Sequence, residues 1–219
     1  MNEKFIQLSK ELKHRPILEK ALGYFPNLPL VAIDCGCGAG NESAYLLSKG
    51  FNVHAFDISI DAQKVCTDRF KDDSKFIFYH ESFEDFNFPS ASLIIASSSL
   101  FFCNPSYFYS VIKRMINALP EGGMLVVDLL GTQDEWVIRE PTKFIGFTYQ
   151  DIADLFLYDF NLLFHKEINE NLPLLDGYIK TWHLHRLILL IYAELSGDFP
   201  LGDSRQPIYK SLRPFDLVS

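Results

Sequence analysis

Apolar and polar positions follow two periods along the chain, and these predict alternating strands and helices. Short apolar-rich runs predict strands, and apolar residues three or four positions apart predict helices. The predicted strands cover residues 30–33, 51–56, 75–80, 92–96 and 124–130. The predicted helices cover residues 5–22, with a bend or restart at Pro16, and residues 41–49, 60–70, 105–119 and 148–157. Two longer strands follow at 159–167 and 180–193, joined by a polar turn at 169–177. The run 92–96 lacks polar alternation, which indicates a strand buried on both faces.

This order of elements predicts a single α/β domain. Strands alternating with helices favour a parallel sheet with right-handed crossovers, and the two closing strands favour a hairpin. We therefore expect a Rossmann-like doubly wound sandwich, whose seven-stranded sheet is mostly parallel with an antiparallel C-terminal strand. The domain is expected to span residues 1–195, with a helical cap at 1–28, and residues 196–219 are expected to form an irregular tail.

Composition and charge narrow the classes of partner. Apolar residues make up 48% of the chain and charged residues 22%, which is typical of a folded globular protein rather than a disordered one. The net charge of −8 argues against a nucleic-acid partner, because neutralising many phosphates usually requires a basic surface. There is no N-terminal apolar signal and no run near the roughly 18 apolar residues of a membrane span. The four cysteines lack zinc-site spacing. We expect a cytoplasmic protein with reduced thiols, no membrane partner and no metal.

A glycine-rich segment follows the first predicted strand and is the strongest candidate for a binding site. Asp34 ends the strand, and Gly36, Gly38 and Gly40 occupy alternate positions before a helix. Such glycines let the chain turn sharply and let a ligand approach the backbone, beside the free N–H groups of the helix. A dinucleotide loop would need its third glycine at Asn41, and no Gly-Lys-Ser/Thr of a P-loop follows. The spacing therefore disfavours a nicotinamide oxidoreductase and a nucleotide triphosphatase.

A second candidate, Asp57, ends the second predicted strand, 17 residues after Gly40. That separation equals one helix and one strand, so both segments should meet at one edge of the sheet. A carboxylate there can accept both hydroxyls of a ribose, and charged acceptors make the stronger hydrogen bonds. The alternative is a solvated residue or a cap for the helix at 60–70.

With these residues in place, the segment from Val31 to Gly40 resembles the first motif of class I S-adenosylmethionine-dependent methyltransferases. The resemblance extends over roughly residues 12–193. The segments that carry it further are 99–108, 119–123, 128–131, 134–136 and 182–185, which are similar to bacterial methyltransferases of the tellurite-resistance group. Ser92 departs from that pattern, because relatives usually have an aspartate there. The resemblance implies S-adenosylmethionine as the cofactor.

The resemblance also implies which residues bind the cofactor. They are Arg15, Asp34, Gly36, Cys37, Gly38, Gly40, Asp57, Ile58, Glu81, Ser82, Phe83 and Ser97. The glycine loop would lie beneath the methionine part, with Asp34 facing its ammonium directly or through water and Arg15 reaching its carboxylate. Asp57 would hold the ribose and Ile58 would cover the adenine.

The segment Glu81-Ser82-Phe83, just past the third predicted strand, would complete the adenine site. The resemblance implies that Glu81 receives the adenine amino group, while a backbone N–H of Ser82 or Phe83 meets the ring. Glu84 and Asp85 compete for the acidic role. An acidic surface loop is the alternative.

The implied reaction is methyl transfer to a small-molecule acceptor, bound over the carboxyl ends of the fourth and fifth predicted strands. The residues expected to line that pocket are Ser97, Ser98, Phe101, Trp136, Phe147 and Tyr149. An inactive cofactor-binding module or regulatory subunit is the rival interpretation. The sequence identifies neither the acceptor nor the oligomeric state.

No catalytic residue stands out in the sequence. Asn104-Pro105-Ser106-Tyr107 resembles the Asn-Pro-Pro-Tyr motif of enzymes that methylate amino groups, but it begins eight residues past Ala96 and is better interpreted as a helix cap. His183 and His185 share one face of a strand and are interpreted as a polar sheet face or edge, because no third metal ligand is evident. We therefore predict a soft nucleophile, such as a thiolate, that needs no general base.

Overall fold

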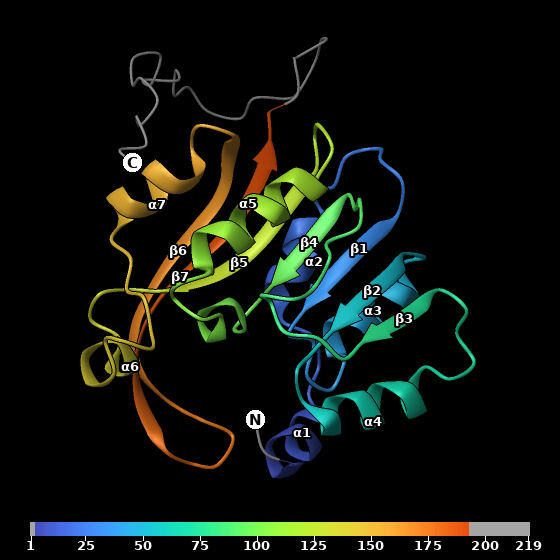
Figure 1. Ribbon diagram of the computed structural model, residues 1–219, viewed down its shortest axis with the longest axis horizontal. Helices are drawn as coiled ribbons and strands as arrows, with labels where there is room; N and C mark the ends of the chain where they lie inside the picture. Colours follow the sequence, from blue (N-terminus) through green and yellow to red (C-terminus); the bar gives the residue numbers. More distant parts are fainter. Residues whose placement is uncertain (1–2, 193–219) are drawn as a thin grey trace.

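The computed structural model describes residues 3–192, which form one seven-stranded sheet (Figure 1). The strands are β1 (Val31–Cys35), β2 (Asn52–Phe56), β3 (Phe76–Tyr79), β4 (Leu93–Ala96), β5 (Met124–Leu130), β6 (Phe160–Pro173) and β7 (Ile179–Ile191). Their order is β3-β2-β1-β4-β5-β7-β6. The first five strands are parallel, whereas β7 runs antiparallel to both β5 and β6. The predicted Rossmann-like, mostly parallel sheet is confirmed.

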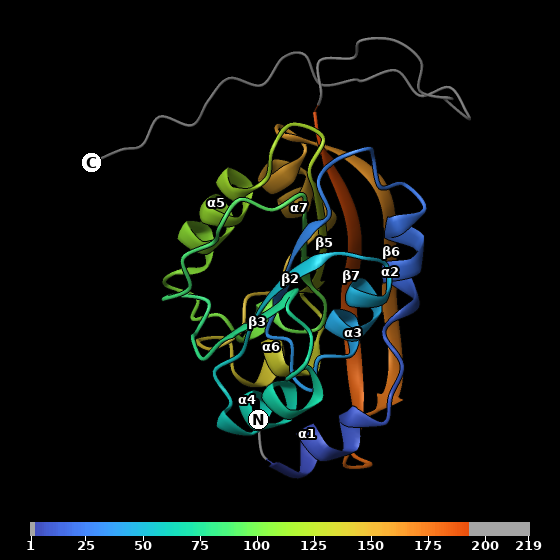
Figure 2. The same cartoon turned by 90° about the vertical axis from the view of Figure 1, so that its right-hand side faces the viewer.

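Helices cover both faces of the sheet, as the edge-on view shows (Figure 2). They are α1 (Glu3–Lys10), α2 (Pro16–Leu22), α3 (Asn41–Ser48), α4 (Ile60–Arg69), α5 (Phe108–Ala118), α6 (Glu135–Arg139) and α7 (Tyr149–Phe156), with a short 3-10 helix, η1, at Leu100–Phe102. Helices α2 and α3 pack on one face, and α5 and α7 on the other. The central strands β4 and β5 are buried along their whole length, as the lack of alternation predicted for β4.

The break predicted at Pro16 divides the first predicted helix into α1 and α2, and two boundaries differ from the predicted ones by three residues or more. The helix predicted from residue 105 begins at Phe108, because the Asn104 side chain accepts a hydrogen bond from the Ser106 N–H (3.0 Å) and closes a turn instead of capping the helix. Strand β6 continues to Pro173, since polar residues such as Asn169 pair across the hairpin with β7. The short helices η1 and α6 were not predicted. The predicted tail at 196–219 lies outside the described residues.

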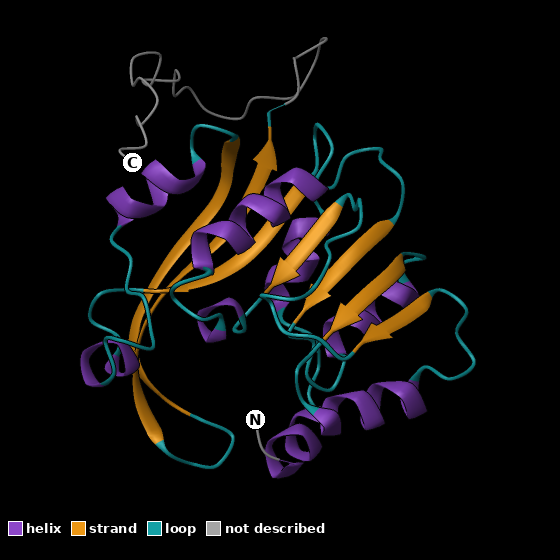
Figure 3. Ribbon diagram, in the orientation of Figure 1, coloured by secondary structure: helices purple, strands orange, loops and turns teal. Residues whose placement is uncertain are grey.

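The arrowheads of β1 to β4 point to one edge of the sheet (Figure 3). We call this end of the sheet, where the parallel strands finish, the carboxyl edge. The segments that follow β1, β2, β4 and β5 lie there, at residues 36–40, 57–59, 97–99 and 131–147. Helix α1 lies beside α4 near this edge, with Ile6 packed on Ala62 and Val65. Among the described residues no helix is both long and apolar enough to cross a membrane.

Candidate functional site

The glycine loop after β1 has left-handed backbone at all three of its glycines, with φ values of 62°, 54° and 75° at Gly36, Gly38 and Gly40. A Cβ at Gly36 would lie 2.7 Å from the Cβ of Ser99, so this glycine is required by the turn after β4. A Cβ at Gly38 would meet nothing nearer than 3.9 Å, at Ile6. Of these two positions, Gly38 therefore leaves space for a ligand to approach the backbone.

Asp57 joins the glycine loop to the end of β2. One carboxylate oxygen accepts the Gly38 N–H (2.9 Å) and the other accepts the Ser59 N–H (2.8 Å). The residue is only 4% exposed, so the alternative of a solvated residue is wrong. Ser59, rather than Asp57, caps α4. Each oxygen keeps a further lone pair for a ligand, and the neighbouring Ile58 side chain is 70% exposed.

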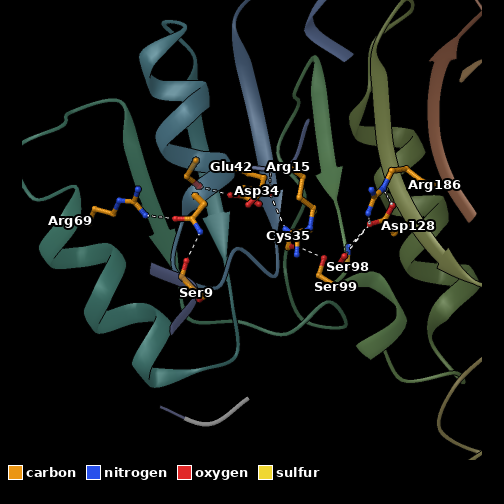
Figure 4. A network of polar contacts seen from close by, with 12 residues as sticks. Ser9, Arg15, Asp34, Cys35, Glu42, Arg69, Ser98, Ser99, Asp128 and Arg186 are labelled. Carbon is orange, nitrogen blue, oxygen red and sulfur yellow. Dashed lines mark hydrogen bonds and ion pairs between the residues drawn. The ribbon is translucent and has the colours of Figure 1, made fainter. Parts of the chain in front are cut away.

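Asp34 lies in a buried polar network beneath the glycine loop (Figure 4). Its carboxylate accepts a hydrogen bond from the Ser43 hydroxyl (2.6 Å) on α3. Glu42, in the first turn of the same helix, accepts hydrogen bonds from the Arg15 backbone N–H (3.1 Å) and guanidinium (2.9 Å). Arg15 caps the start of α2 and already has a carboxylate partner, although its side chain remains partly exposed. Its predicted role at a ligand carboxylate is untested and would use its other N–H groups.

Burial raises the pKa of Asp34 to about 7, and the nearby negative charge of Glu42 adds to the rise, while Ser43 and Arg15 oppose it. A cation placed beside Asp34 would favour the ionised carboxylate. Sequence reasoning missed Glu42. The available signal was a carboxylate in the first helical turn directly after the glycine loop.

The turn after β4 packs directly on the glycine loop. The Ser99 hydroxyl donates to the Cys35 carbonyl oxygen (2.6 Å). Ser98 has a φ of 53° and is the only non-glycine residue with positive φ in the part of the chain that the structure describes. The Ser97 hydroxyl oxygen is buried and, alone among the buried side-chain polar atoms of residues 6–192, has no hydrogen-bond partner. An orphaned polar atom of this kind calls for a partner outside the chain.

The segment after β3 is a tight turn. The Ser82 hydroxyl donates to the Asp85 carboxylate (2.7 Å) and accepts the Asp85 N–H (3.2 Å). Phe83 is buried edge-on against Phe56, with ring centroids 5.0 Å apart. Glu84 accepts the Asn104 N–H (2.6 Å), so both competing carboxylates have protein partners. This favours Glu81, which is partly exposed just past the strand, as the free acidic group.

Arg114 on α5 supports this turn and was not found from the sequence. Its guanidinium donates to the carbonyl oxygens of Phe83, Glu84 and Phe86, each at 2.8 Å. A planar group with several donors can fix three carbonyl groups at once. The turn is therefore held from the helix layer rather than by its own residues alone.

Known proteins share both a sequence pattern and the fold of this chain. Residues 32–123 match the family model of a methyltransferase domain. The fold is similar to TehB from Haemophilus influenzae, with 17% identity, a TM-score of 0.69, and 87% of this chain and 67% of that chain covered. Residues 32–123 of the chain therefore form a methyltransferase domain. Over these residues the predicted methyltransferase family is confirmed, and S-adenosylmethionine, the predicted cofactor, is the methyl donor that this family uses.

Two further structures resemble the methyltransferase. A SAM-dependent methyltransferase from Methanosarcina mazei is 18% identical, with a TM-score of 0.62, and the match covers 84% of this chain and 100% of that one. The 1,6-didemethyltoxoflavin-N1-methyltransferase of Burkholderia thailandensis, solved with 1,6-didemethyltoxoflavin and S-adenosylhomocysteine bound, is 16% identical, with a TM-score of 0.60 and coverage of 88% and 80%. No curated protein matches the sequence significantly.

The cysteines of the methyltransferase are all free and buried. Cys37 lies within the glycine loop, and the Cys66 thiol from α4 lies 3.4 Å from the Gly38 carbonyl oxygen. Hydrogen bonding to Cys66 and burial raise the pKa of Cys37 well above that of a free thiol. Protonated, buried thiols are poor nucleophiles, which favours a packing role for both.

The acceptor pocket predicted from the sequence is only partly assembled. Phe101 and Phe147 are buried, and a cavity of about 10 Å³ lies between them, too small for an organic acceptor. Trp136 contacts Phe101, with ring centroids 5.9 Å apart. Tyr149 instead lies against His165 of β6, at 5.2 Å. The structure therefore brings Phe101 and Trp136 together but places Tyr149 elsewhere.

Of the two possibilities for His183 and His185, a polar sheet face or edge, the edge is wrong, because β7 lies between β5 and β6. Both rings are buried and hydrogen-bonded. The His183 Nδ1 accepts the Gln133 N–H (2.9 Å), so its Nε2 carries the proton and donates to Glu167 (2.7 Å). The His185 Nε2 lies 3.2 Å from the Phe147 carbonyl oxygen.

Glu167, His183 and His185 place ligand-type atoms within 4.8 Å of one another. Two ligands of a tetrahedral zinc ion would lie roughly 3.3 Å apart, given bonds of about 2.0–2.1 Å. The 2.7 Å between Glu167 and His183 is a hydrogen-bond separation, and the occupied His183 Nδ1 fixes the tautomer that cannot ligate through Nε2. The geometry therefore favours a hydrogen-bonded cluster over a metal site.

A buried ion pair adds to these hydrogen bonds between β7 and residues 131–147. The Lys180 ammonium lies 2.5 and 2.6 Å from the two carboxylate oxygens of Asp134, and both side chains are fully buried. The ammonium also lies over the rings of Trp182 (3.8 Å to the centroid) and Trp136 (4.4 Å). The contacts of Lys180, His183 and His185 together fasten residues 131–147 to β7. None of these pairings was predicted.

Proposed function

We propose that this methyltransferase transfers the sulfonium methyl group of S-adenosylmethionine to a small-molecule acceptor. The observation that carries the proposal is the buried, unpartnered hydroxyl of Ser97 at the carboxyl end of β4. It belongs to the turn that packs on the glycine loop through Ser99 and Gly36. Nothing in the described chain satisfies this hydroxyl, so it supports a polar ligand at this point of the carboxyl edge.

The neighbouring residues each bind a different part of the cofactor. Asp57 accepts the ribose hydroxyls with its remaining lone pairs, and the exposed Ile58 covers one face of the adenine. Glu81 receives the adenine amino group, and the backbone of Ser82 or Phe83 meets the ring. The methionine part lies on the glycine loop, in contact with Gly36, Cys37, Gly38, Gly40 and Ser97.

Charges support the placement of the methionine part. Asp34 and Glu42 lie together with Arg15 as the nearest cation, which leaves a surplus of negative charge when both carboxylates are ionised. Burial first, and the negative charge of Glu42 second, raise the pKa of Asp34. The ammonium of the cofactor relieves that surplus, and the partly exposed guanidinium of Arg15 meets the carboxylate.

The acceptor site lies over the ends of β4 and β5, beside residues 131–147. A small acceptor is supported by the net charge of −8, which disfavours nucleic acid, and by the 1,6-didemethyltoxoflavin bound to the similar structure from Burkholderia thailandensis. The 10 Å³ cavity near Phe101 implies that the acceptor lies on this loop rather than beneath it.

In the reaction, a lone pair of the acceptor forms a bond to the methyl carbon as the carbon–sulfur bond breaks, and S-adenosylhomocysteine leaves as a neutral thioether. The main contribution of the enzyme is to hold the two reactants in line. Among the described residues of β7 and the 131–147 loop, His183 and His185 have both ring nitrogens occupied, and Asp134 is paired with Lys180. This supports an acceptor that is already a good nucleophile and needs no general base.

The test has two steps. Calorimetry should first show binding of S-adenosylmethionine and S-adenosylhomocysteine but not of NAD, and equal affinity for NAD would contradict the cofactor site. Metabolite extracts should then be incubated with methyl-labelled S-adenosylmethionine, and labelled products separated by mass. Transfer to a thiol or selenol supports the proposal. Tight cofactor binding without any labelled product across extracts supports an inactive cofactor-binding module instead.

A further inference from the structure

We propose that Asp128 and Arg186 are positioning residues, which set the cofactor site by holding Ser98 in its left-handed conformation. The inference rests on the proposed function, in which the cofactor lies beside the turn formed by residues 97–99. Neither residue lies in the glycine loop or in the loop after β2.

Ser98 occupies a backbone conformation that residues with a side chain rarely adopt. Such a residue persists only where its surroundings hold it, and these conformations cluster at functional sites. The turn begins directly after Ala96, the last residue of β4. The strand itself does not require a left-handed residue at this point.

Asp128 holds Ser98 in this left-handed conformation by hydrogen bonds. One of its carboxylate oxygens accepts both the backbone N–H (3.0 Å) and the hydroxyl (3.1 Å) of Ser98. Asp128 is fully buried on β5, opposite Arg186 of β7 in the sheet register. The Arg186 guanidinium donates to both carboxylate oxygens, at 2.8 and 3.0 Å, which fixes the plane of the carboxylate (Figure 4).

The conformation of Ser98 sets the positions of both of its neighbours, Ser97 and Ser99. On one side, it directs the unpartnered hydroxyl of Ser97. On the other, it places Ser99 against Gly36 and on the Cys35 carbonyl oxygen. A right-handed Ser98 would redirect both, so an ion pair between β5 and β7 determines how β4 meets the glycine loop.

The Arg186 guanidinium keeps its charge at every relevant pH. Burial lowers the pKa of Arg186, but the hydrogen bonds and charge of Asp128 outweigh it, with Glu42 adding to them, so the pKa is raised overall. Glu42 is the partner of Arg15 at the methionine end of the site. Arg15 is therefore paired with Glu42 and Arg186 with Asp128. Of the two arginines, only Arg186 contacts the carboxylate that holds Ser98.

The experiment is a double-mutant cycle that measures the Kd of S-adenosylhomocysteine by calorimetry. Asp128→Asn should weaken binding about tenfold, which corresponds to the loss of a conformational restraint. In a Ser98→Gly background the same change should cost less than about threefold, because glycine adopts the left-handed conformation without the carboxylate. The melting temperature and circular dichroism of every variant establish that it is folded.

Asp134→Asn is the matched control, because it breaks another buried ion pair that ends on β7. Its effect on the Kd should be small and equal in both backgrounds. If Asp128→Asn fails to fold, Arg186→Lys replaces it, with a loss of about threefold that Ser98→Gly restores. Equal losses in both backgrounds overturn the positioning role. Failure of the wild-type protein to bind S-adenosylhomocysteine at all overturns the proposed function instead.

Discussion

The two halves of the carboxyl edge are built in different ways. On the cofactor half, a carboxylate accepts hydrogen bonds from backbone N–H groups of the neighbouring loop, as Asp57 does from Gly38, 19 residues away. On the hairpin half, side chains of β7 bind the 131–147 loop across longer separations, as Lys180 does with Asp134, 46 residues away. The first half depends on turns that glycine makes possible. The second depends on charges and imidazoles that find their partners only after the hairpin has formed.

The buried carboxylates of the two halves also differ in how they are neutralised. Asp134 has an ammonium on both of its oxygens. Asp34 has a serine hydroxyl and a second carboxylate nearby, and its pKa is raised to about 7. The hairpin half therefore has an internal cation for its buried carboxylate, whereas in the proposed function a positively charged ligand supplies one to Asp34. The predictions below test that difference, from the largest expected change in cofactor affinity to the smallest.

Gly38→Val should abolish binding of S-adenosylhomocysteine in calorimetry, at least about a hundredfold in Kd, because a β-branched residue resists a φ of 54° and fills the open side of the loop. Gly177→Ala is the control. That glycine also has a positive φ, of 90°, but it lies at the hairpin turn with nothing within 4 Å. The control should lose stability and keep its Kd, and a similar loss of affinity in both variants would contradict the assignment.

Asp57→Ala should raise the Kd at least about tenfold, because hydrogen bonds to a charged acceptor contribute roughly 1.5–3 kcal/mol each. The melting temperature should fall too, since two backbone N–H groups lose their partner. Ser59→Ala removes the cap of α4 at a cost of about 1 kcal/mol in stability. A Kd for Asp57→Ala no weaker than that of this control would contradict the ribose role.

Asp34 should make cofactor affinity depend on pH. Affinity should fall as the pH drops below about 7, by up to roughly tenfold per pH unit, because the protonated carboxyl no longer attracts the ammonium. Stability without ligand should change in the opposite direction. The folded pKa lies above the ordinary value of 3.8, so this contribution to stability is complete below pH 3.8 and is lost as the pH rises through 7.

Asp34→Asn should flatten both profiles and serves as the control for that titration. Calorimetry and thermal unfolding between pH 5.5 and 8.5, read in the same buffers, measure the two trends. A pH-dependent affinity that persists unchanged in Asp34→Asn would assign the effect to another group.

Lys180→Met should leave the Kd of S-adenosylhomocysteine within about twofold while lowering stability by roughly 3–5 kcal/mol, since it leaves Asp134 buried without a partner. Lys180→Met combined with Asp134→Leu should recover part of that loss. Denaturant unfolding measures both. A large loss of cofactor affinity in the folded single variant would show that the two halves are energetically coupled.

The sequence predicted the cofactor half far better than the hairpin half, for a physical reason. That Gly38 and Asp57 lie side by side follows from strand–loop–helix spacing, which is local, and β5 was predicted to the residue from its apolar run. Lys180 and Arg186 were not recognised, because a charged residue in a strand indicates a solvated face until its partner is known. Their partners, Asp134 and Asp128, lie 46 and 58 residues away.

The contact of Lys180 with two indole rings has a spectroscopic consequence. Trp136 and Trp182 are the only tryptophans of the chain, and both lie against this one ammonium. Emission excited at the red edge of indole absorption therefore originates wholly on the hairpin half. Unlabelled protein thus carries a built-in optical probe of the loop where the acceptor is proposed to bind, and a compound library can be screened by its emission before any turnover is known.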